Sequence, residues 1–224
     1  MIIGLIPARA GSLSIRNKNL VDGPKLFGKT LIDYTIEAAL GSSLDATVVS
    51  TNDVATLRVM ERLPGIFTHR RSDVLSGSDS PTEATIEAVL KEWPSVEACV
   101  LLQLTSPLRT SADIDRALAQ FRSEGSDSLV SVVPEYGFTW YEGIEGARGD
   151  YDPLYRPMRQ EQHKWKENGA IYIFSRAWWD QHHVRCGGKV SLYKMGRETG
   201  IEVDEALDLA LVAAIMAARN EPMP

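Results

Sequence analysis

The sequence predicts an α/β fold in which a mainly parallel sheet carries helices on both faces. Short apolar runs rich in β-branched residues alternate with amphipathic stretches along most of the 224 residues, which is the pattern of consecutive βαβ units. Hydrophobic residues make up 44% of the chain and charged residues 24%, so the chain can bury a sizeable core. Such sheets bind ligands at the carboxyl ends of their strands, and functional side chains are expected there.

Six segments are predicted to be strands because they are short, apolar and rich in β-branched residues. They are Ile2–Ile6, Ala46–Ser50, Ala98–Gln103, Ser128–Val133, Ala170–Phe174 and Val190–Lys194. The first run is apolar throughout, as expected of a strand that is buried on both faces of a parallel sheet.

Amphipathic stretches between these runs are predicted to be helices. The stretch Leu31–Leu40 places Ile32, Ile36 and Ala39 on one face, which is the spacing of a helix that packs on a core. The other predicted helices are Val54–Leu63, a helix from Ser80 to about Trp93, Ala112–Phe121 and Glu205–Arg219.

Two of these helices have sequence signals for their first turn. Ser80 is followed by Pro81, Thr82 and Glu83, the pattern of a capping box with proline at the first helical position. Ser111 is predicted to cap Ala112–Phe121, with acidic residues near the positive end of the helix dipole. Ser80 therefore has a structural role that competes with any role in ligand binding.

Residues 134–167 interrupt the alternation and are too long for a simple loop in a compact domain. The segment is poor in aliphatic residues and rich in aromatic ones: Tyr136, Phe138, Trp140, Tyr141, Tyr151, Tyr155 and Trp165. One interpretation is a mobile flap or a small satellite cluster. The other, which we favour, is an arm that packs on another subunit, because interfaces are enriched in Tyr, Trp and Arg.

Charge and composition exclude several classes of protein. The net charge of −6 argues against a general nucleic-acid binder. The longest apolar runs are far shorter than a membrane span, and the first run lacks the basic flank of a secretory signal. The two cysteines, Cys99 in an apolar run and Cys186 in a glycine-rich loop, are expected to be free thiols. We therefore expect a cytoplasmic protein that is not bound to membranes.

The loop after the first apolar run has the chemistry of a polyphosphate site. Small residues follow the strand in the stretch Pro7-Ala8-Arg9-Ala10-Gly11-Ser12, and the cations Arg16 and Lys18 come next. Small residues let backbone N–H groups approach an anion, and guanidinium and ammonium groups bind its oxygens. The loop matches neither the phosphate loop that ends in Gly-Lys-Ser/Thr nor the GxGxxG pattern of dinucleotide folds.

Six blocks, in order along nearly the whole chain, resemble the acylneuraminate (sialic acid) cytidylyltransferases. They are Ile6-Pro7-Ala8-Arg9-Ala10-Gly11-Ser12 with Lys18-Asn19, Gly28-Lys29-Thr30-Leu31-Ile32-Asp33-Tyr34-Thr35-Ile36, Arg71 with Leu75-Ser76-Gly77-Ser78-Asp79-Ser80-Pro81-Thr82, Leu101-Leu102-Gln103-Leu104-Thr105-Ser106-Pro107-Leu108-Arg109-Thr110, Glu167-Asn168-Gly169-Ala170-Ile171-Tyr172, and Ile201-Glu202-Val203-Asp204 with Leu207-Asp208. One block alone is weak evidence, whereas their shared order and spacing make the resemblance specific.

The resemblance implies a Rossmann-like nucleotidyltransferase fold and a reaction. Members of the family couple CTP to a 2-keto sugar acid, which gives a CMP-sugar and pyrophosphate, with Mg²⁺ as cofactor. The resemblance also implies a homodimer. Residues 1–133 and 168–224 would form the catalytic domain, and residues 134–167 an inserted dimerisation arm that crosses to the partner, where Arg156, Arg159 and Lys166 would reach its active site.

The nucleotide site implied by the family comprises Ala8, Arg9, Ala10, Gly11, Ser12, Asn19, Arg71, Ser78 and Ser80. Arg9 and Lys18 are expected to bind the triphosphate and, with Asp204, to be the catalytic residues. The amide of Asn19 suits a ribose or a base edge. The alternatives are structural: a surface salt bridge for Arg9, a solvated surface position for Lys18 and a turn for Asn19.

The sugar site implied by the family comprises Gln103, Thr105, Ser106, Arg109, Lys166 and Asn168. The first four directly follow a predicted strand, where a doubly wound sheet binds its ligand. Arg109 has two interpretations, since its guanidinium is expected to pair either with a carboxylate of the substrate or with Asp113.

Glu202 and Asp204 are the predicted metal ligands. Two residues two positions apart on an extended segment point to the same side, and carboxylates with waters and phosphate oxygens are the ligands Mg²⁺ prefers. The alternative is that Asp204 caps the last helix. Asp204 is also a candidate to deprotonate the sugar hydroxyl.

Four residues depart from the pattern of the family. Ala10 replaces a glycine, Leu13 replaces a lysine that would contact phosphate, Arg16 stands where a proline is common, and Glu202 replaces an aspartate. Arg16 is a candidate to substitute for the missing lysine. These departures leave open a nucleotide-binding protein without catalysis. They also leave open another nucleotide, or another sugar acid of the KDO or legionaminate type, although Lys18-Asn19 favours the sialic branch over the KDO branch.

Overall fold

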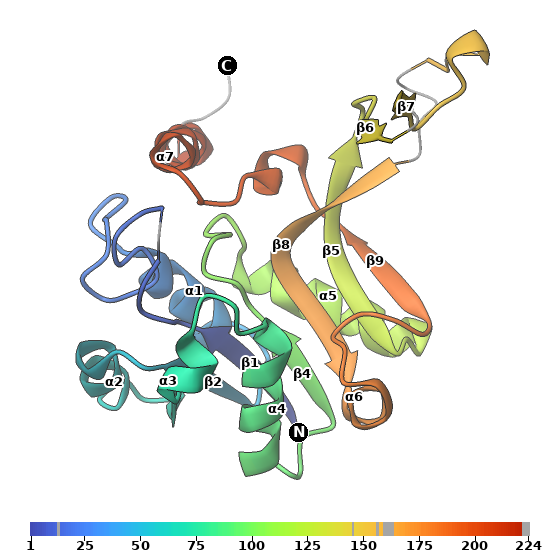
Figure 1. The fold of residues 1–224 in the computed structure, drawn as a ribbon. Coiled ribbons are helices and arrows are strands. Elements are labelled where there is room, and N and C mark those ends of the chain that lie inside the picture. The colour runs from blue at the N-terminus through green and yellow to red at the C-terminus, as the bar shows by residue number, and fades with distance from the viewer. Residues whose placement is uncertain (13, 145, 156, 159–163, 221–224) are drawn as a thin grey trace.

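The computed structural model describes residues 1–12, 14–144, 146–155, 157–158 and 164–220 (Figure 1). Its centre is a seven-stranded sheet with the strand order β3-β2-β1-β4-β8-β5-β9. The strands are β1 (Ile2–Pro7), β2 (Ala46–Thr51), β3 (Ile66–Arg70), β4 (Ala98–Leu101), β5 (Ser128–Glu135), β8 (Lys164–Ser175) and β9 (Val190–Lys194). Only β8 runs against the others within this sheet, pairing antiparallel with β4 and β5. The predicted mainly parallel sheet is confirmed.

All six predicted strands form, with differences at their ends. The run Ala98–Gln103 leaves the sheet after Leu101, and the run Ala170–Phe174 is the second half of a longer strand that begins at Lys164. The prediction missed β3, an edge strand of which only His69 is buried, because its sequence lacks a continuous apolar run. Its position extends the sheet beyond β2 and places Arg71 next to the ends of the central strands.

Helices cover both faces of the sheet, as predicted (Figure 1). They are α1 (Leu31–Leu40), α2 (Val54–Met60), α3 (Asp73–Ser76), α4 (Thr82–Glu92), α5 (Ser111–Glu124), α6 (Arg176–His182) and α7 (Ala206–Asn220). One core forms where Ile36 of α1 and Leu118 of α5 pack on Ile6 and its neighbours. The other forms where Ile86 of α4 and Trp179 of α6 pack on the opposite face. The seven-residue α6 was not predicted because it is too short to show a helical period.

The predicted helix caps are wrong by one residue or more. Helix α4 begins at Thr82, so the cap position falls on Pro81, and Ser80 lies one residue too early to cap it. Thr110, not Ser111, caps α5, because Asp113 completes a capping box only from Thr110. Asp204 does not cap α7 either. Instead the Asp208 carboxylate accepts the N–H groups of Asp204 and Glu205, at 2.9 and 2.7 Å.

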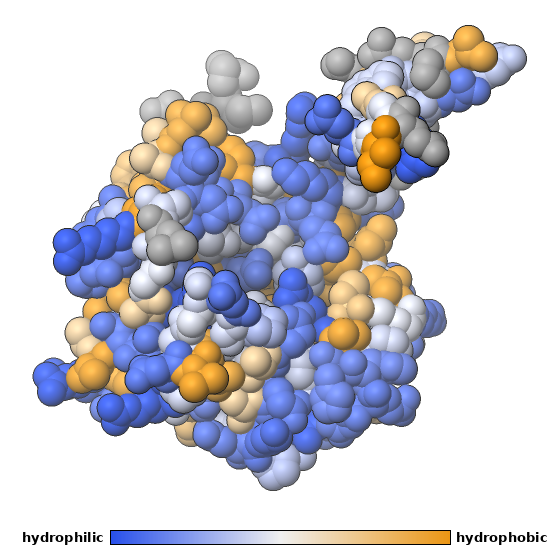
Figure 2. All heavy atoms as spheres, viewed as in Figure 1, coloured by the Kyte–Doolittle hydropathy of each residue, from blue (hydrophilic) through white to orange (hydrophobic). Residues whose placement is uncertain are grey.

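The segment that interrupts the alternation projects from the body of the molecule (Figure 1). Strands β5 and β8 continue as a pair past the sheet, and β6 (Trp140–Gly143) and β7 (Gly146–Gly149) form an exposed hairpin beyond them, followed by the short 3₁₀ helix η1 (Pro153–Tyr155). Figure 2 shows apolar residues on the surface of this projection. Arg156, Arg159 and His163 of this segment lie outside the described residues.

None of the helices in the described residues is long and apolar enough to cross a membrane. Cys99 is buried and Cys186 is partly buried, and both are free thiols, as predicted.

Candidate active site

A cavity of about 220 Å³ lies where the loops after β1, β3 and β4 meet. Its walls are formed by Pro7, Arg9, Asn19, Arg71, Ser78, Ser80, Thr82, Thr85, Gln103, Leu104 and Thr105. Arg9 follows β1, Arg71 follows β3 and Gln103 follows β4. Because these strands are parallel, all three side chains lie at the end of the sheet where the strands' carboxyl ends meet. The structure thus brings together seven of the residues predicted to bind nucleotide or sugar. We call this cavity the nucleotide cavity.

The nucleotide cavity holds two guanidinium groups that have no carboxylate partner among the described residues. Arg71 is 6% exposed and donates from Nε to Ser50 Oγ at 3.3 Å. Burial, followed by the positive charge of Arg9, lowers the pKa of Arg71 to about 10. Arg9 donates from Nη1 to the Gly77 carbonyl at 3.2 Å. Two neighbouring cations that raise each other's free energy favour a bound anion.

A buried hydrogen-bond chain holds Arg71 in place. Ser50 of β2 lies opposite His69 of β3, and its Oγ is 2.9 Å from His69 Nδ1. Since Arg71 donates to Ser50 Oγ, the hydroxyl hydrogen can go to Nδ1 of a neutral imidazole. Sequence reasoning missed both residues; for Ser50 the available signal was a polar side chain inside an apolar strand, where a buried hydroxyl needs a hydrogen-bond partner.

This chain predicts a pH dependence of stability. Burial lowers the pKa of His69, outweighing the Glu92 carboxylate, which raises it. The unfolded chain therefore takes up a proton on His69 at a higher pH than the folded chain does, and the free energy of unfolding should fall as the pH drops below about 6.5. Urea unfolding between pH 7.5 and 5 should show a shallower decline in the His69→Gln variant. Parallel curves for the two proteins would contradict the assignment.

The first turn of α4 forms one wall of the nucleotide cavity. Ser78, Ser80 and the unpredicted Thr82 and Thr85 face it from this turn and the loop before it. The N-terminus of a helix presents N–H groups and a partial positive charge, both of which favour anions. Since Ser80 does not cap the helix, its hydroxyl is available to a ligand.

Asn19 lines the cavity, and its Oδ1 is buried without a hydrogen-bond partner among the described residues. The adjacent Lys18 points elsewhere. It is 7% exposed, and its Nζ donates to the Val203 carbonyl and to Asp204 Oδ1, both at 2.9 Å. Lys18 therefore orients Asp204, and it does not line the nucleotide cavity.

The backbone of the loop after β1 contributes less than predicted. The N–H of Ala8 donates to the Ser50 carbonyl at 2.8 Å, and that of Ala10 donates to Asn52 Oδ1 at 2.9 Å. Both amides therefore already have partners within the chain. Gly11 and Ser12 remain candidates to donate backbone N–H groups to phosphate. Gly11 has a φ of 82°, and no atom lies within 4 Å of a Cβ built on it. Leu13 lies outside the described residues.

Three of the predicted sugar-binding residues, Ser106, Arg109 and Asn168, are buried and donate hydrogen bonds within the chain. Asn168 is 0% exposed, accepts from Ser131 at 2.6 Å and donates to Thr199 Oγ1 at 3.1 Å, so its side chain cannot reach a substrate. The Ser106 hydroxyl is also buried and donates to the Asn168 carbonyl at 3.0 Å. Arg109 lines a second cavity on another side.

Asp113, one of the two partners predicted for Arg109, forms no ion pair with it in the described residues. Its Nη1 donates to the backbone carbonyls of Gln103 and Ala170. Asp113, the alternative partner, forms its ion pair with Arg116 at 2.6 Å.

The two predicted metal ligands lie at the edge of the nucleotide cavity. Thr105, which lines the cavity, donates weakly to Glu202 Oε2 at 3.5 Å. Burial raises the pKa of Glu202, and the negative charge of Asp204 adds to this effect, whereas the positive charge of Lys166 opposes it. The carboxylates are thus close enough to repel each other, with the exposed Lys166 nearby.

A family model described as cytidylyltransferase matches residues 3–178. The chain belongs to the cytidylyltransferase family. N-acylneuraminate cytidylyltransferase B of Danio rerio is 32% identical over 91% of this chain and 48% of its own length. Post-translational flagellin modification protein B of Campylobacter coli is 28% identical over 98% of this chain and 96% of its own length. The chain spans about half the length of the first curated relatives it matches.

Solved structures share the fold of this cytidylyltransferase-family chain. A CMP:2-keto-3-deoxy-manno-octonic acid synthetase complexed with CTP superposes with a TM-score of 0.71 and 16% identity, over 97% of this chain and 99% of that one. A Mycobacterium tuberculosis protein solved with manganese has a TM-score of 0.60 and 15% identity, over 95% of this chain and 98% of that one. At these identities the likeness concerns the fold alone.

The residues at the edge of the nucleotide cavity fit a divalent cation. In the described residues no cluster of three or more His, Cys, Asp or Glu side chains could hold a metal by itself. Mg²⁺, however, binds through one or two carboxylates together with substrate phosphates and waters. Glu202 and Asp204 supply such a pair, and their mutual repulsion is a cost that a cation would relieve.

Proposed function

We propose that this chain transfers the cytidylyl group of CTP to a sialic-acid-like 2-keto sugar acid and releases pyrophosphate. The observation that carries the proposal is the pair of guanidinium groups, Arg9 and Arg71, which share one cavity without a carboxylate partner among the described residues. A triphosphate supplies the missing negative charge, and guanidinium binds phosphate oxygens through paired hydrogen bonds. The family match and the names of the relatives support CTP and the sugar acid.

In the proposed reaction the anomeric hydroxyl of the sugar attacks the α-phosphorus of CTP. A bond forms between the hydroxyl oxygen and the α-phosphorus, and the bond to the oxygen that bridges to the β-phosphate breaks. Pyrophosphate leaves with that electron pair, and the hydroxyl proton passes to a base, for which we propose Asp204. Catalysis of this kind consists largely of positioning the reactants and neutralising charge.

The nucleotide is proposed to bind along the strand ends. Arg9 and Arg71 would bind the phosphates, with the amides of Gly11 and Ser12 and the hydroxyls of Ser78 and Ser80 around them. Asn19 lines the same cavity, and we propose that its side chain contacts a ribose hydroxyl or an edge of cytosine.

The sugar acid is proposed to bind beside Gln103 and Thr105, between the nucleotide and the two carboxylates. Lys166 is exposed and near Glu202, so its ammonium suits the carboxylate of the sugar. Ser106 and Asn168 would act indirectly, by fixing the loop that carries Gln103 and Thr105 to β5 and β8.

We propose Mg²⁺ as the cofactor, held by Glu202 and Asp204. When bound, it would neutralise charge on the triphosphate and on the departing pyrophosphate. Lys18 serves this site by orienting Asp204 through its buried ammonium. Glu202 reaches about one methylene further than the aspartate usual in the family, which leaves it able to bind the cation directly or through a water.

We further propose that residues 134–167 form a dimerisation arm and that the reaction occurs in the cytoplasm. The projecting hairpin exposes Trp140 and Tyr141, and Tyr155 is exposed in η1 beyond it. Exposed aromatic residues that gather on one projecting element are typical of a surface that a partner covers. The two free thiols suit a reducing compartment.

The proposal predicts pyrophosphate release from CTP and Mg²⁺ with one of a panel of acids: N-acetylneuraminate, a legionaminate-type acid and KDO. The amount of pyrophosphate released should equal the amount of CMP-sugar formed. UTP or ATP should replace CTP poorly, because we propose that Asn19 and its neighbours recognise the cytidine. Light scattering on the same sample should return the mass of a dimer. Tight CTP binding without release for any acid would instead identify a nucleotide-binding protein without catalysis.

A further inference from the structure

Asp208 lies in the first turn of α7 and holds the backbone just before that helix. One oxygen of its carboxylate, Oδ2, accepts the N–H of Asp204 at 2.9 Å and that of Glu205 at 2.7 Å. An acidic residue in the first turn commonly reaches back to the N–H at the start of its own helix, which accounts for the bond to Glu205. The bond to Asp204 goes one residue further, to a predicted metal ligand, and helix capping does not require it.

The bond to Asp204 also involves the other predicted metal ligand. The N–H of Asp204 lies 3.1 Å from the Glu202 carbonyl as well, so Glu202 and Asp208 share this one donor. A hydrogen bond between residues two positions apart closes a γ-turn, which joins the backbones of the two carboxylate residues. The arrangement of such a pair matters because Mg²⁺ demands near-ideal octahedral geometry.

Two other residues hold the same segment. Val203, which is buried between the two carboxylate residues, donates its N–H to the Thr105 carbonyl at 2.7 Å. Lys18 donates to the Val203 carbonyl and to Asp204 Oδ1, both at 2.9 Å. Thr105 and Lys18 thus fix the preceding residue and the Asp204 side chain, whereas Asp208 fixes the Asp204 backbone from the side of α7.

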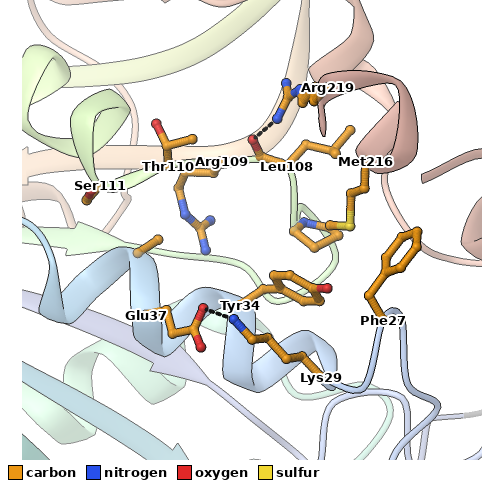
Figure 3. A pocket seen from close by; sticks show the side chains of 12 residues that line it. Phe27, Lys29, Tyr34, Glu37, Leu108, Arg109, Thr110, Ser111, Met216 and Arg219 are labelled. Carbon is orange, nitrogen blue, oxygen red and sulfur yellow. Dashed lines mark hydrogen bonds and ion pairs between the residues drawn. The ribbon is translucent and has the colours of Figure 1, made fainter. Parts of the chain in front are cut away.

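Helix α7 itself is loosely packed. Among its described side chains only Val212 is buried, and a cavity of about 510 Å³ lies between α1 and the C-terminal half of α7 (Figure 3). At that end Arg219 donates to the Leu108 carbonyl at 2.9 Å and pairs with Glu198 at 3.1 Å. Asp208 and Arg219, about three turns apart, therefore tie the two ends of the helix.

We propose that Asp208 is a positioning residue for the divalent cation of the proposed function. Its hydrogen bonds hold the Asp204 backbone so that the carboxylates of Glu202 and Asp204 face one cation, and Asp208 itself does not touch that cation. Groups that orient metal ligands from outside contribute strongly to metal affinity. The inference rests on the proposed function, since it requires that Glu202 and Asp204 bind Mg²⁺ together with CTP.

The test is calorimetric titration of the full chain with CTP, once in Mg²⁺ and once in EDTA, without any sugar acid. In the wild type Mg²⁺ should tighten CTP binding, because the cation joins the phosphates to the two carboxylates. Asp208→Ala should weaken CTP binding in Mg²⁺ about tenfold, the lower end of the loss typical of such outer groups. In EDTA its affinity for CTP should equal that of the wild type.

Two variants separate positioning from charge and from helix stability. Asp208→Asn removes the charge but keeps an oxygen for both N–H groups, so its affinity for CTP in Mg²⁺ should match the wild type. A tenfold loss in Asp208→Asn would overturn the positioning role, because the charge would then be what matters. Arg219→Met loosens the other end of α7 and should lower the Tm without changing either affinity. A Mg²⁺-dependent loss in Arg219→Met would also overturn the proposal, since any loosening of α7 would then suffice.

Failure of the proposed function gives a different result. A wild type that binds no CTP, or binds it equally in Mg²⁺ and EDTA, would overturn the proposed nucleotide or metal site and this inference with it. A wild type that responds to Mg²⁺, with Asp208→Ala responding equally, would overturn the role of Asp208 alone.

Discussion

Asp204→Asn should lower the turnover of pyrophosphate release by about 10²- to 10³-fold while the chain stays folded, a loss typical of removing one group that stabilises transition-state charge. Asparagine keeps an oxygen for the Lys18 ammonium, which now bonds to Asp204 at 2.9 Å. The negative charge that would bind Mg²⁺ and accept the proton of the sugar hydroxyl is lost. Steady-state pyrophosphate release, measured at several Mg²⁺ concentrations, checks the result.

Asp180→Asn is the matched control. Asp180 also pairs with one cation, Arg176 at 2.6 Å, and is similarly exposed, but it lies on α6, away from the nucleotide cavity. Its turnover should equal that of the wild type. Near-normal turnover in Asp204→Asn would remove Asp204 from the proposed mechanism. Unfolding of Asp204→Asn, seen by circular dichroism, would show that the Lys18–Asp204 pair is structural, since Lys18 is buried and depends on a counterion.

The sequence predicts the sheet well because buried parallel strands are continuous apolar runs, and such runs are visible without tertiary information. Strand β3 was missed because edge strands alternate or expose their side chains, as Phe67 does. The caps failed for a different reason. Thr110 and Ser111 offer the same hydroxyl, and only the position of Asp113 relative to the first helical residue decides between them.

The candidate site was predictable where a side chain directly follows a strand. Arg9, Arg71 and Gln103 reach one cavity for that reason. Sequence cannot show whether a polar residue faces a ligand or a neighbouring backbone, since both need the same residue types. Asn168 is an example. It was predicted to bind the sugar because its side chain is a polar amide, but that amide forms hydrogen bonds with Ser131, Thr199 and Met195.

Gly169→Ala should reduce turnover at least tenfold, because Gly169 of β8 packs against Glu202, a proposed metal ligand. Gly169 has a φ of 65°, and a Cβ there would lie 2.7 Å from Glu202 Cδ and 2.8 Å from Gln103 Oε1. Both side chains would have to move, and both belong to the proposed site. Because the crowded atoms are the ends of side chains, they can shift while the fold persists, so the loss should appear in activity. Pyrophosphate release by the purified variant measures it.

Gly125→Ala separates the crowding from the backbone strain. Gly125 has a φ of 58°, but a Cβ there meets nothing within 4 Å, and it ends α5 far from Glu202. Both alanines carry the left-handed strain of about 1 kcal/mol, which lowers the Tm by roughly 2–4 °C in a chain of this length. Only Gly169→Ala should lose activity. Equal turnover in the two variants would mean that the positions of Glu202 and Gln103 do not limit the reaction. Glu202 would then have to be removed from the proposed metal site.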